Sequence, residues 1–472
     1  MASLTIKTRF APSPTGLLHL GNARIALFCV LLARRERGIF LLRIEDTDRD
    51  RSTVDYIEAL QDDLHWLGLA WQEGPQTNGA QGPYLQSERA AIYQSYFDIL
   101  SEKGLAYPCF CSAQELALAR KAQLSAGRPP RYANICADLP AERIAQRMSQ
   151  GLKPTLRFRI PRGRSVEFND LVRGSQIFNS DDIGDFIIRR ADGTPAFFFT
   201  NALDDALMDV THVLRGEDHL SNTPRQIMLL QALGLRIPEY GHVSLILGPD
   251  GAPMSKRDGG NSVSGLREAG YFPGALNNYL AQLGHHYEVN AYRSLDELAA
   301  EFDLGKIGRS PARFDSAQLL HWQQQAIAQS SIDELWRWAG AEVHALVPPQ
   351  QINDFIEAVR PNVSLPHDVL HWARILYEDV LEPDADARRI IDQAGSEFFA
   401  HAVQALDQYP ADFKALAAEL KKETGIGGKA LFQPLRAILT GALDGPEMAR
   451  LLPLMGAMRA RQRLQAGLSS KA

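Results

Sequence analysis

The chain has 472 residues, of which 45% are hydrophobic, and its formal net charge at pH 7 is −6. A chain of this length can bury several hydrophobic cores, so we expect three or more domains. The negative charge excludes a protein that binds nucleic acid through an overall basic surface, but it allows local basic patches. No apolar run approaches the roughly 20 residues of a membrane span, and residues 1–10 lack the apolar core of a signal peptide. We therefore expect a cytoplasmic protein with no membrane segment.

The first expected elements are a strand, a tight turn and a helix. Apolar and polar residues alternate over 4–10, as in a half-buried strand, and two prolines and a glycine then break it. Apolar residues recur at helical spacing from Leu20 until Gly38 ends the helix. The start of this helix is an anion site, because its free N–H groups and its dipole point outward. His19 at this position would donate to a phosphate, although a loop histidine is more often structural.

Strands and helices alternate in the next hundred residues. Residues 39–44 are mostly apolar, as in a parallel strand covered on both faces, and residues 45–48 are largely acidic. After Ser52, a suitable N-cap, apolar side chains share one helical face up to residue 67, and a second helix is expected over 87–103. This alternation predicts a Rossmann-type, doubly wound α/β domain, which binds ligands at the carboxyl ends of its strands.

A different pattern begins near residue 107. The pair Cys109 and Cys111, followed later by Cys136, favours a metal site over a disulfide in a cytosolic protein, and three separate thiols are the alternative. Basic residues alternate partly over 153–164, as in a solvated edge strand guarded by charge.

The first fold resumes near Gly184. Strands are expected over 186–188, 196–200 and 209–215, and Thr223 begins a helix with a proline in its first turn. After these elements the chain reaches a short loop and then becomes helical, with capping boxes predicted to begin helices at Ser294 and Ser331.

That loop, residues 253–257, follows an apolar run and a Gly-Pro-Asp-Gly turn. Ser255, Lys256 and Arg257 give it a hydroxyl and two cations, which would close on a triphosphate. Without other information, the loop is only a basic surface turn. The expected domains are a catalytic domain (1–105 and 184–240), an α+β insertion (106–183), a domain that carries the loop (241–322) and an all-α region of two subdomains (323–472).

Two motifs together resemble the paired signatures of class I aminoacyl-tRNA synthetases, His-Ile-Gly-His and Lys-Met-Ser-Lys-Ser. Further stretches at 11–16, 43–48 and 215–219 are similar to bacterial glutamyl-tRNA synthetase in particular. Asn22 replaces the second histidine and Pro253 the first lysine of the signatures. The two motifs read His19-Leu20-Gly21-Asn22 and Pro253-Met254-Ser255-Lys256-Arg257.

The resemblance implies glutamate–tRNA ligase activity. ATP would activate L-glutamate to glutamyl-adenylate, and the terminal ribose of tRNA(Glu) would then take the glutamyl group. Magnesium would accompany the triphosphate, and the family usually needs tRNA before it activates glutamate. His19 and Lys256 would stabilise the phosphorus transition state. Gly21 would leave room for adenine, and the other ATP-binding residues would be Asn22, Ser255 and Arg257.

The resemblance also implies a glutamate pocket. Arg9 and Arg215 would bind carboxylate, for which guanidinium is the matching planar fork. Glu45 would hold the substrate ammonium, while Ser13 and Asn201 would add hydrogen bonds. Two further features belong to this region. Phe197 stands where many relatives have a tyrosine, and Glu217, Asp218 and His219 would serve the ATP ribose, the pocket wall or only a helix start.

The helical region resembles the family's anticodon-binding domain, with Lys429 and Arg436 as contacts to phosphates or bases. Asn362 aligns with an arginine that rejects tRNA(Gln), so we expect this chain also, or preferentially, to accept tRNA(Gln). In the insertion, the family contacts the tRNA acceptor arm, so the resemblance favours a phosphate-contacting face for the basic residues of 153–164 over a solvated edge strand. Some members bind zinc in this insertion through Cys-x-Cys and Cys-x-His. Here the zinc ligands would be Cys109, Cys111, Cys136 and Asp138.

Three alternatives remain open at this point: a glutaminyl-tRNA synthetase, a truncated paralogue that glutamylates a modified tRNA base, and a catalytically silent tRNA-binding protein. The length of the helical region argues against the truncated paralogue. We expect a monomer.

Overall fold

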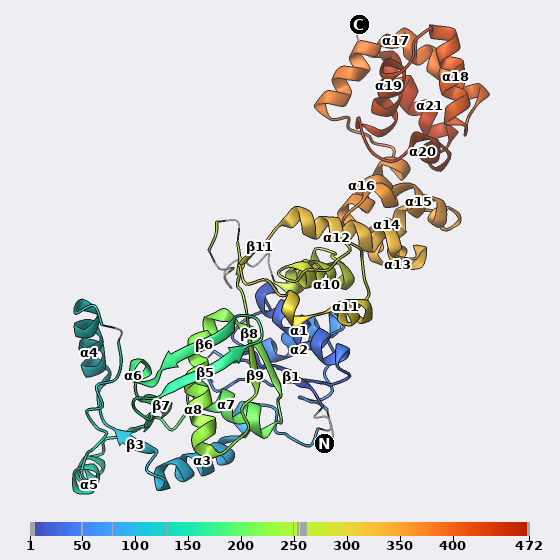
Figure 1. Ribbon diagram of the computed structural model, residues 1–472. Coiled ribbons are helices and arrows are strands. Elements are labelled where there is room, and N and C mark those ends of the chain that lie inside the picture. Colours follow the sequence, from blue (N-terminus) through green and yellow to red (C-terminus); the bar gives the residue numbers. More distant parts are fainter. Residues whose placement is uncertain are drawn as a thin grey trace. The chain divides into compact units, whose positions relative to one another are not determined.

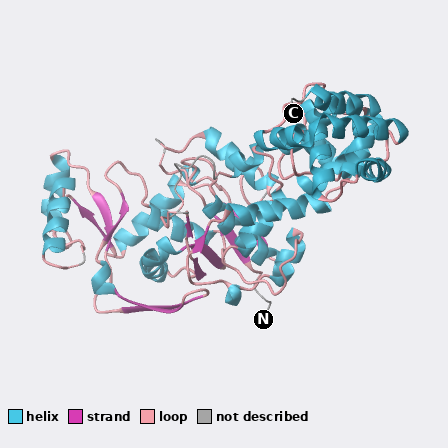
Figure 2. Cartoon of the chain, turned by 90° about the horizontal axis from the view of Figure 1, so that it is seen from above, coloured by secondary structure: helices cyan, strands magenta, loops and turns pink. Residues whose placement is uncertain are grey.

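The computed structural model describes residues 5–48, 51–77, 79–128, 130–248, 250–252, 254 and 262–469 (Figure 1). The chain forms two compact units, one of Met1–Arg267 with Leu276–Ser316 and one of Glu268–Ala275 with Ala317–Ala472. All strands of the described residues belong to the first unit (Figure 2). No helix in these ranges combines the length and apolarity needed to cross a membrane.

A four-stranded parallel sheet lies at the centre of the first unit, in the order β2-β1-β8-β9. The doubly wound α/β class is therefore confirmed. The strands are β1 (Lys7–Phe10), β2 (Ile39–Leu42), β8 (His212–Gly216) and β9 (Glu239–Val243), and the helices around them are α1 (Leu20–Arg35), α2 (Val54–Trp66), η1 (Gln86–Glu88), α3 (Ala90–Glu102), α7 (Phe197–Leu207), η2 (Glu217–Asn222) and α8 (Thr223–Leu233). Strand β9 extends the sheet beyond residue 240, where the catalytic domain was expected to end.

Strand β1 is buried along its whole length, so the expected half-buried strand is wrong. It is a central strand, and each polar side chain has a partner inside the protein. Lys7 Nζ lies 2.8 Å from Glu73 Oε1, and Thr8 Oγ1 donates to the Cys29 carbonyl at 2.8 Å. The alternating pattern identified which side chains are polar, but it could not show that distant partners allow them to be buried.

Two other local expectations need correction. Helix α2 begins after Thr53, whose hydroxyl accepts from Tyr56 N, and not after Ser52. Residues 196–200 are not a strand, since helix α7 starts at Phe197. The aromatic run at residues 197–199 favours β structure by its intrinsic propensity. In the structure Phe199 instead stacks on Phe97 of α3, with ring centroids 4.4 Å apart.

The insertion contains a three-stranded antiparallel sheet, β3-β4-β7, and a separate hairpin, β5-β6. The strand expected over 186–188 is β7, and it pairs with β4 of the insertion instead of resuming the first fold. Strand β4 lies in the middle of its sheet, so of the two interpretations of residues 153–164 the solvated edge strand is wrong. Its Arg157 is buried, with the guanidinium 3.7 Å from the ring centroid of Tyr132. The elements are β3 (Ala106–Cys109), α4 (Ala113–Ser125), α5 (Ala141–Ser149), β4 (Thr155–Phe158), β5 (Ser165–Asp170), β6 (Gly174–Asn179), α6 (Ser180–Ile183) and β7 (Phe186–Arg189).

The remaining chain is mostly helical. Short strands β10 (Ile246–Leu247) and β11 (Ala312–Arg313) pair in parallel, near α9 (Val263–Glu268), α10 (Pro273–Gln282), α11 (Leu295–Glu301) and η4 (Leu304–Lys306) in the sequence. Capping boxes at Ser294 and Ser331 begin α11 and α13, as the sequence predicts. The second unit packs one apolar core among α12 (Ser316–Gln329), α13 (Ile332–Ala339), α14 (Ala341–Leu346), η5 (Pro349–Gln351), α15 (Ile352–Val359), η6 (Arg360–Asn362), α16 (Pro366–Tyr377), α17 (Ala385–Gln408), α18 (Phe413–Thr424), α19 (Lys429–Thr440), α20 (Met448–Met455), α21 (Ala457–Ala466) and η7 (Gly467–Ser469).

Candidate active site and metal centre

Buried charges gather where strands β1, β2 and β8 end. Arg9 Nε donates to Asp205 Oδ1 at 3.1 Å, and Arg43 Nη1 donates to the same oxygen at 2.7 Å. Burial opposes ionisation of Asp205, but the two guanidinium charges hold the pKa of its carboxyl below the ordinary value. Arg9 thus lies at the expected carboxyl edge of the sheet, and the Asp205 carboxylate of α7 pairs with its guanidinium.

Glu45 and Asn201, which the sequence predicts to share a glutamate pocket, meet at this edge. Asn201 Nδ2 donates to Glu45 Oε1 at 2.7 Å, and Arg43 Nη2 donates to the same oxygen at 3.0 Å. Burial raises the pKa of Glu45. Ser13 lies in the exposed turn beside Pro12, whose carbonyl accepts from the Glu45 backbone N–H at 3.0 Å.

Arg215 is a buried cation, 6% exposed, whose hydrogen-bond partners are all uncharged groups. Its Nε donates to His242 Nε2 at 3.0 Å and its Nη1 to Asn201 Oδ1 at 3.4 Å. Its Nη2 donates to Thr223 Oγ1 at 2.8 Å and to Gln226 Oε1 at 2.7 Å. Burial lowers the pKa of Arg215 to about 10. A buried charge held only by neutral groups favours an anionic ligand beside it.

The loop that the sequence predicts to bind phosphate leads into the start of α1. His19 is the N-cap residue, and its Nδ1 accepts from Asn22 N at 3.3 Å. In the neutral ring this leaves the proton on Nε2. A Cβ on Gly21 would lie 3.1 Å from two atoms of the His19 ring, so the glycine makes room for this histidine. Leu18 O accepts from Val263 N at 2.9 Å, which joins the loop to the start of α9.

The second signature cannot be placed beside the first. Pro253, Ser255, Lys256 and Arg257 lie outside the described residues, so their approach to His19 stays a prediction. Met254 is described, and its N–H donates to Ile246 O at 3.1 Å.

The first acidic residue after β8, Glu217, makes contacts that hold neighbouring elements together. Glu217 forms an ion pair with Arg173 and accepts from Leu245 N at 3.1 Å, so it joins η2 to the insertion hairpin and to the end of β9. The ring of Phe197 lies 5.5 Å from that of His219. Burial lowers the pKa of His219 to about 4.

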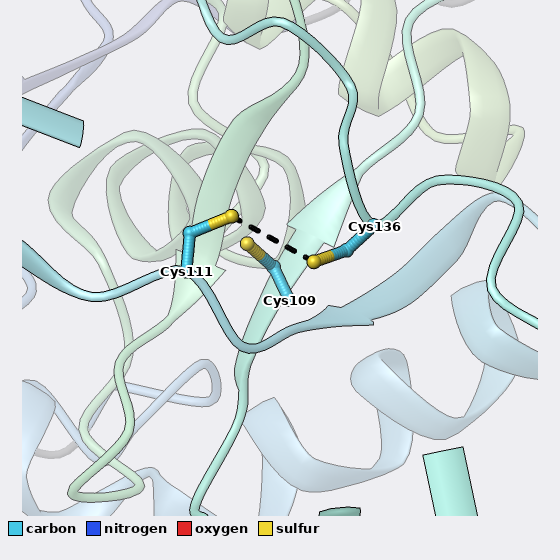
Figure 3. A group of neighbouring side chains, drawn as sticks. All are labelled: Cys109, Cys111 and Cys136. Atoms are coloured by element: carbon cyan, nitrogen blue, oxygen red, sulfur yellow. Dashed lines mark hydrogen bonds between the residues drawn. The ribbon is translucent and has the colours of Figure 1, made fainter. Parts of the chain in front are cut away.

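Three cysteine sulfurs of the insertion point toward one another (Figure 3), all within 4.8 Å. Cys111 Sγ lies 3.7 Å from Cys136 Sγ, well beyond the roughly 2.05 Å of a disulfide. Two thiolates on tetrahedral zinc, with Zn–S near 2.3 Å, would lie about 3.8 Å apart. Burial opposes ionisation of Cys109, but hydrogen bonds from Tyr132 and Arg157 lower the pKa of its thiol to about 7.

Asp138 does not join these cysteines, so its expected place as the fourth ligand is wrong in this structure. Its side chain is 86% exposed and pairs with Arg159 Nη1 at 3.2 Å. The phenolic oxygen of Tyr132 instead lies 3.3 Å from Cys109 Sγ and 3.4 Å from Cys111 Sγ. Cys136 N also donates to this oxygen, at 3.0 Å.

The three expected anticodon residues lie on two elements of the second unit, Asn362 on η6 and both Lys429 and Arg436 on α19. Asn362 is exposed at the end of η6, and Lys429 is exposed at the start of α19. Arg436 is partly buried, and its Nη1 donates to Pro446 O at 3.0 Å. Part of this arginine is therefore used to hold the chain after α19.

Sequence reasoning missed Arg43, Asp205, Gln226 and His242. Asp205 had a usable signal, since adjacent Asp204 and Asp205 interrupt an otherwise apolar helix and need buried partners. His242 lies in the short strand β9, whose sequence does not reveal its partners.

Known proteins are similar to this chain over nearly its whole length. A family model described as "tRNA synthetases class I (E and Q), catalytic domain" matches residues 5–321, and one described as "Anticodon binding domain" matches residues 326–468. The chain is 60% identical to glutamate–tRNA ligase 2 of Nitrosococcus oceani over 465 residues, 98% of each chain. It is 54% identical to glutamate–tRNA ligase 1 of Methylococcus capsulatus over 459 residues, 97% of this chain and 98% of that one. It is also similar to the crystal structure of a glutamate tRNA ligase from Elizabethkingia meningosepticum in complex with its amino acid, with a TM-score of 0.89 and 29% identity over 99% of this chain and 100% of the other.

Proposed function

Since this chain belongs to the glutamate–tRNA ligases, a family of class I aminoacyl-tRNA synthetases, we propose specific roles for its residues in that reaction. The enzyme uses ATP to join glutamate to tRNA. The similarity extends over the anticodon-binding domain, and the relatives are glutamate–tRNA ligases, so the three alternatives above receive no support.

Glutamate binds at the buried edge of the sheet. The single observation that carries this assignment is the Arg215 guanidinium, which is buried among neutral groups and therefore keeps its charge for a ligand. A carboxylate is the planar, bidentate partner of guanidinium. Glu45 then accepts from the substrate ammonium, with Asn201 fixing the orientation of its carboxylate. Arg9 adds positive charge, and Ser13, in the turn after β1, adds a hydrogen bond to the substrate.

ATP binds at the loop before α1. His19 Nε2–H donates to an α-phosphate oxygen as negative charge develops, while Asn22 N holds the ring in the required tautomer. Lys256 of the second signature would stabilise the same phosphate, with Ser255 and Arg257 in supporting roles, and magnesium would accompany the triphosphate. Positioning and charge stabilisation are sufficient for this chemistry, since the substrate carboxylate is itself the nucleophile. Substitution of Arg215 tests the pocket and substitution of His19 tests the phosphate site.

Asn362 makes the enzyme accept tRNA(Gln) as well as tRNA(Glu). Its short amide lacks the bidentate reach with which arginine would discriminate between the two anticodons. We expect the native protein to glutamylate both purified tRNAs, and Asn362→Arg to lower kcat/KM for tRNA(Gln) at least tenfold while charging of tRNA(Glu) stays within twofold. Asn362→Gln is the matched control. Failure of the native protein to charge tRNA(Gln) would contradict this assignment.

The cysteines of the insertion hold one zinc ion, with the Tyr132 oxygen as the fourth donor. Three clustered thiols and an S–S separation of 3.7 Å fit tetrahedral zinc. The metal would tie β3 to the loop before α5 and would take no part in catalysis.

Metal analysis of the purified enzyme should find about one zinc per chain, because three thiolates form a strong site. Cys136→Ser should lose most of this zinc, Tyr132→Phe should bind it more weakly, and Asp138→Ala should keep it in full. A zinc-free native protein, or loss of zinc in Asp138→Ala, would contradict the assignment.

A further inference from the structure

A buried row of three side chains leads from the insertion hairpin to the guanidinium of Arg215. Asp170 is the last residue of β5, His242 lies on β9, and Arg215 lies on β8 directly opposite His242 in the parallel register. Their exposed fractions are 1%, 0% and 6%, respectively. The row therefore connects two structural parts of the first unit inside the protein.

The contacts fix the proton on His242. Arg215 Nε can only donate, so His242 Nε2, 3.0 Å away, accepts. The imidazole proton then lies on Nδ1, which donates to Asp170 Oδ2 at 2.5 Å. Asp170 is itself held by the backbone N–H groups of Val172 and Arg173, at 3.0 and 2.8 Å. Burial lowers the pKa of His242, in agreement with a neutral ring.

Arg215 differs in this respect from the other two arginines of the pocket. Arg9 and Arg43 donate directly to Asp205, so a carboxylate offsets their charge. For Arg215 the nearest carboxylate in this row, that of Asp170, lies on the far side of the imidazole ring. The arrangement orients the guanidinium firmly and leaves its positive charge to attract a ligand.

We propose that Asp170 and His242 are positioning residues, which aim the Arg215 guanidinium at the side-chain carboxylate of glutamate. This inference rests on the proposed role of Arg215. It also makes the row a determinant of specificity, because glutamine has a neutral amide in place of the carboxylate and gains far less from a cation whose hydrogen-bond partners are all neutral.

Asp170→Asn tests the proposal, since asparagine can donate to Nδ1 and thereby allow a proton on Nε2, facing Arg215 Nε. In pyrophosphate exchange with tRNA present, we expect KM for glutamate to rise about tenfold, while KM for ATP and kcat stay within twofold. The preference for glutamate over glutamine should fall by a similar factor. Asp185→Asn is the matched control, because Asp185 is another buried carboxylate of the insertion and accepts from Tyr107 Oη at 2.7 Å. It should leave KM for glutamate unchanged.

A second pair of variants keeps the test independent of the folding of Asp170→Asn. The amide of His242→Gln can accept from Arg215 and donate to Asp170, whereas the shorter amide of His242→Asn cannot reach both. KM for glutamate should stay within about threefold in the first and rise about tenfold in the second. Equal KM values in this pair, or parallel changes of both KM values and the melting temperature in Asp170→Asn, would overturn the proposal. If Arg215→Met itself leaves KM for glutamate unchanged, the pocket assignment fails instead.

Discussion

Arg215→Met should lower kcat/KM for glutamate about a thousandfold, with most of the loss in KM. Removal of one partner from a buried, hydrogen-bonded charge pair costs about 2–5 kcal/mol, and each 1.4 kcal/mol is tenfold in affinity. Because the hydrogen-bond partners of Arg215 are neutral, its removal strands no buried carboxylate of the protein. Steady-state pyrophosphate exchange at varied glutamate, with tRNA present, measures the effect.

Arg34→Gln is a suitable control for this result. Arg34 is partly exposed and pairs with Asp296, whose side chain is 87% exposed, so both kinetic constants should stay within twofold. A thermal melt of Arg215→Met should show a cooperative transition. A folded Arg215→Met with native KM for glutamate would remove Arg215 from the pocket.

His19→Asn should lower kcat for pyrophosphate exchange by about 10²- to 10³-fold, the usual effect of losing one donor to a developing oxyanion. Asparagine is a favourable N-cap residue, so it retains the bond to the backbone at the start of α1 while the Nε2 donor is lost. The melting temperature should therefore stay close to that of the native enzyme. KM for glutamate should change little, because His19 has no role in that pocket.

His19→Ala provides the comparison, since it removes both the cap and the donor. It should show a similar loss of kcat together with a lower melting temperature, by the equivalent of about 1 kcal/mol. Native kcat in a folded His19→Asn would contradict the phosphate role.

The sequence predicted the elements that depend on local pattern. Helix α1 follows from apolar spacing after a proline-rich turn, and the capping boxes at Ser294 and Ser331 begin helices as expected. Local patterns failed where contacts distant in the sequence decide the structure. Residues 196–200 became helical because Phe199 packs on Phe97. Strand β1 is fully buried because partners far along the chain satisfy its polar side chains.

The candidate site divides in the same way. Signature residues such as His19, Glu45 and Arg215 could be assigned from their motifs, and the structure brings Glu45 and Arg215 together through Asn201. The residues that orient these side chains could not be assigned, since His242 and Asp205 belong to no recognisable motif. The resemblance places Asp138 at the position of the family's last zinc ligand, yet in the structure its side chain pairs with Arg159.

The central claim is that one pocket places the side-chain carboxylate of glutamate at Arg215 and its activated carboxyl beside the phosphate held by His19. A crystal structure with a non-hydrolysable glutamyl-adenylate analogue tests it most directly. We expect the analogue's side-chain carboxylate in hydrogen-bonding contact with Arg215, and its phosphate mimic within reach of His19 Nε2 and the Lys256 ammonium. An analogue whose carboxylate lies away from Arg215, or whose phosphate mimic contacts neither His19 nor Lys256, would contradict the account.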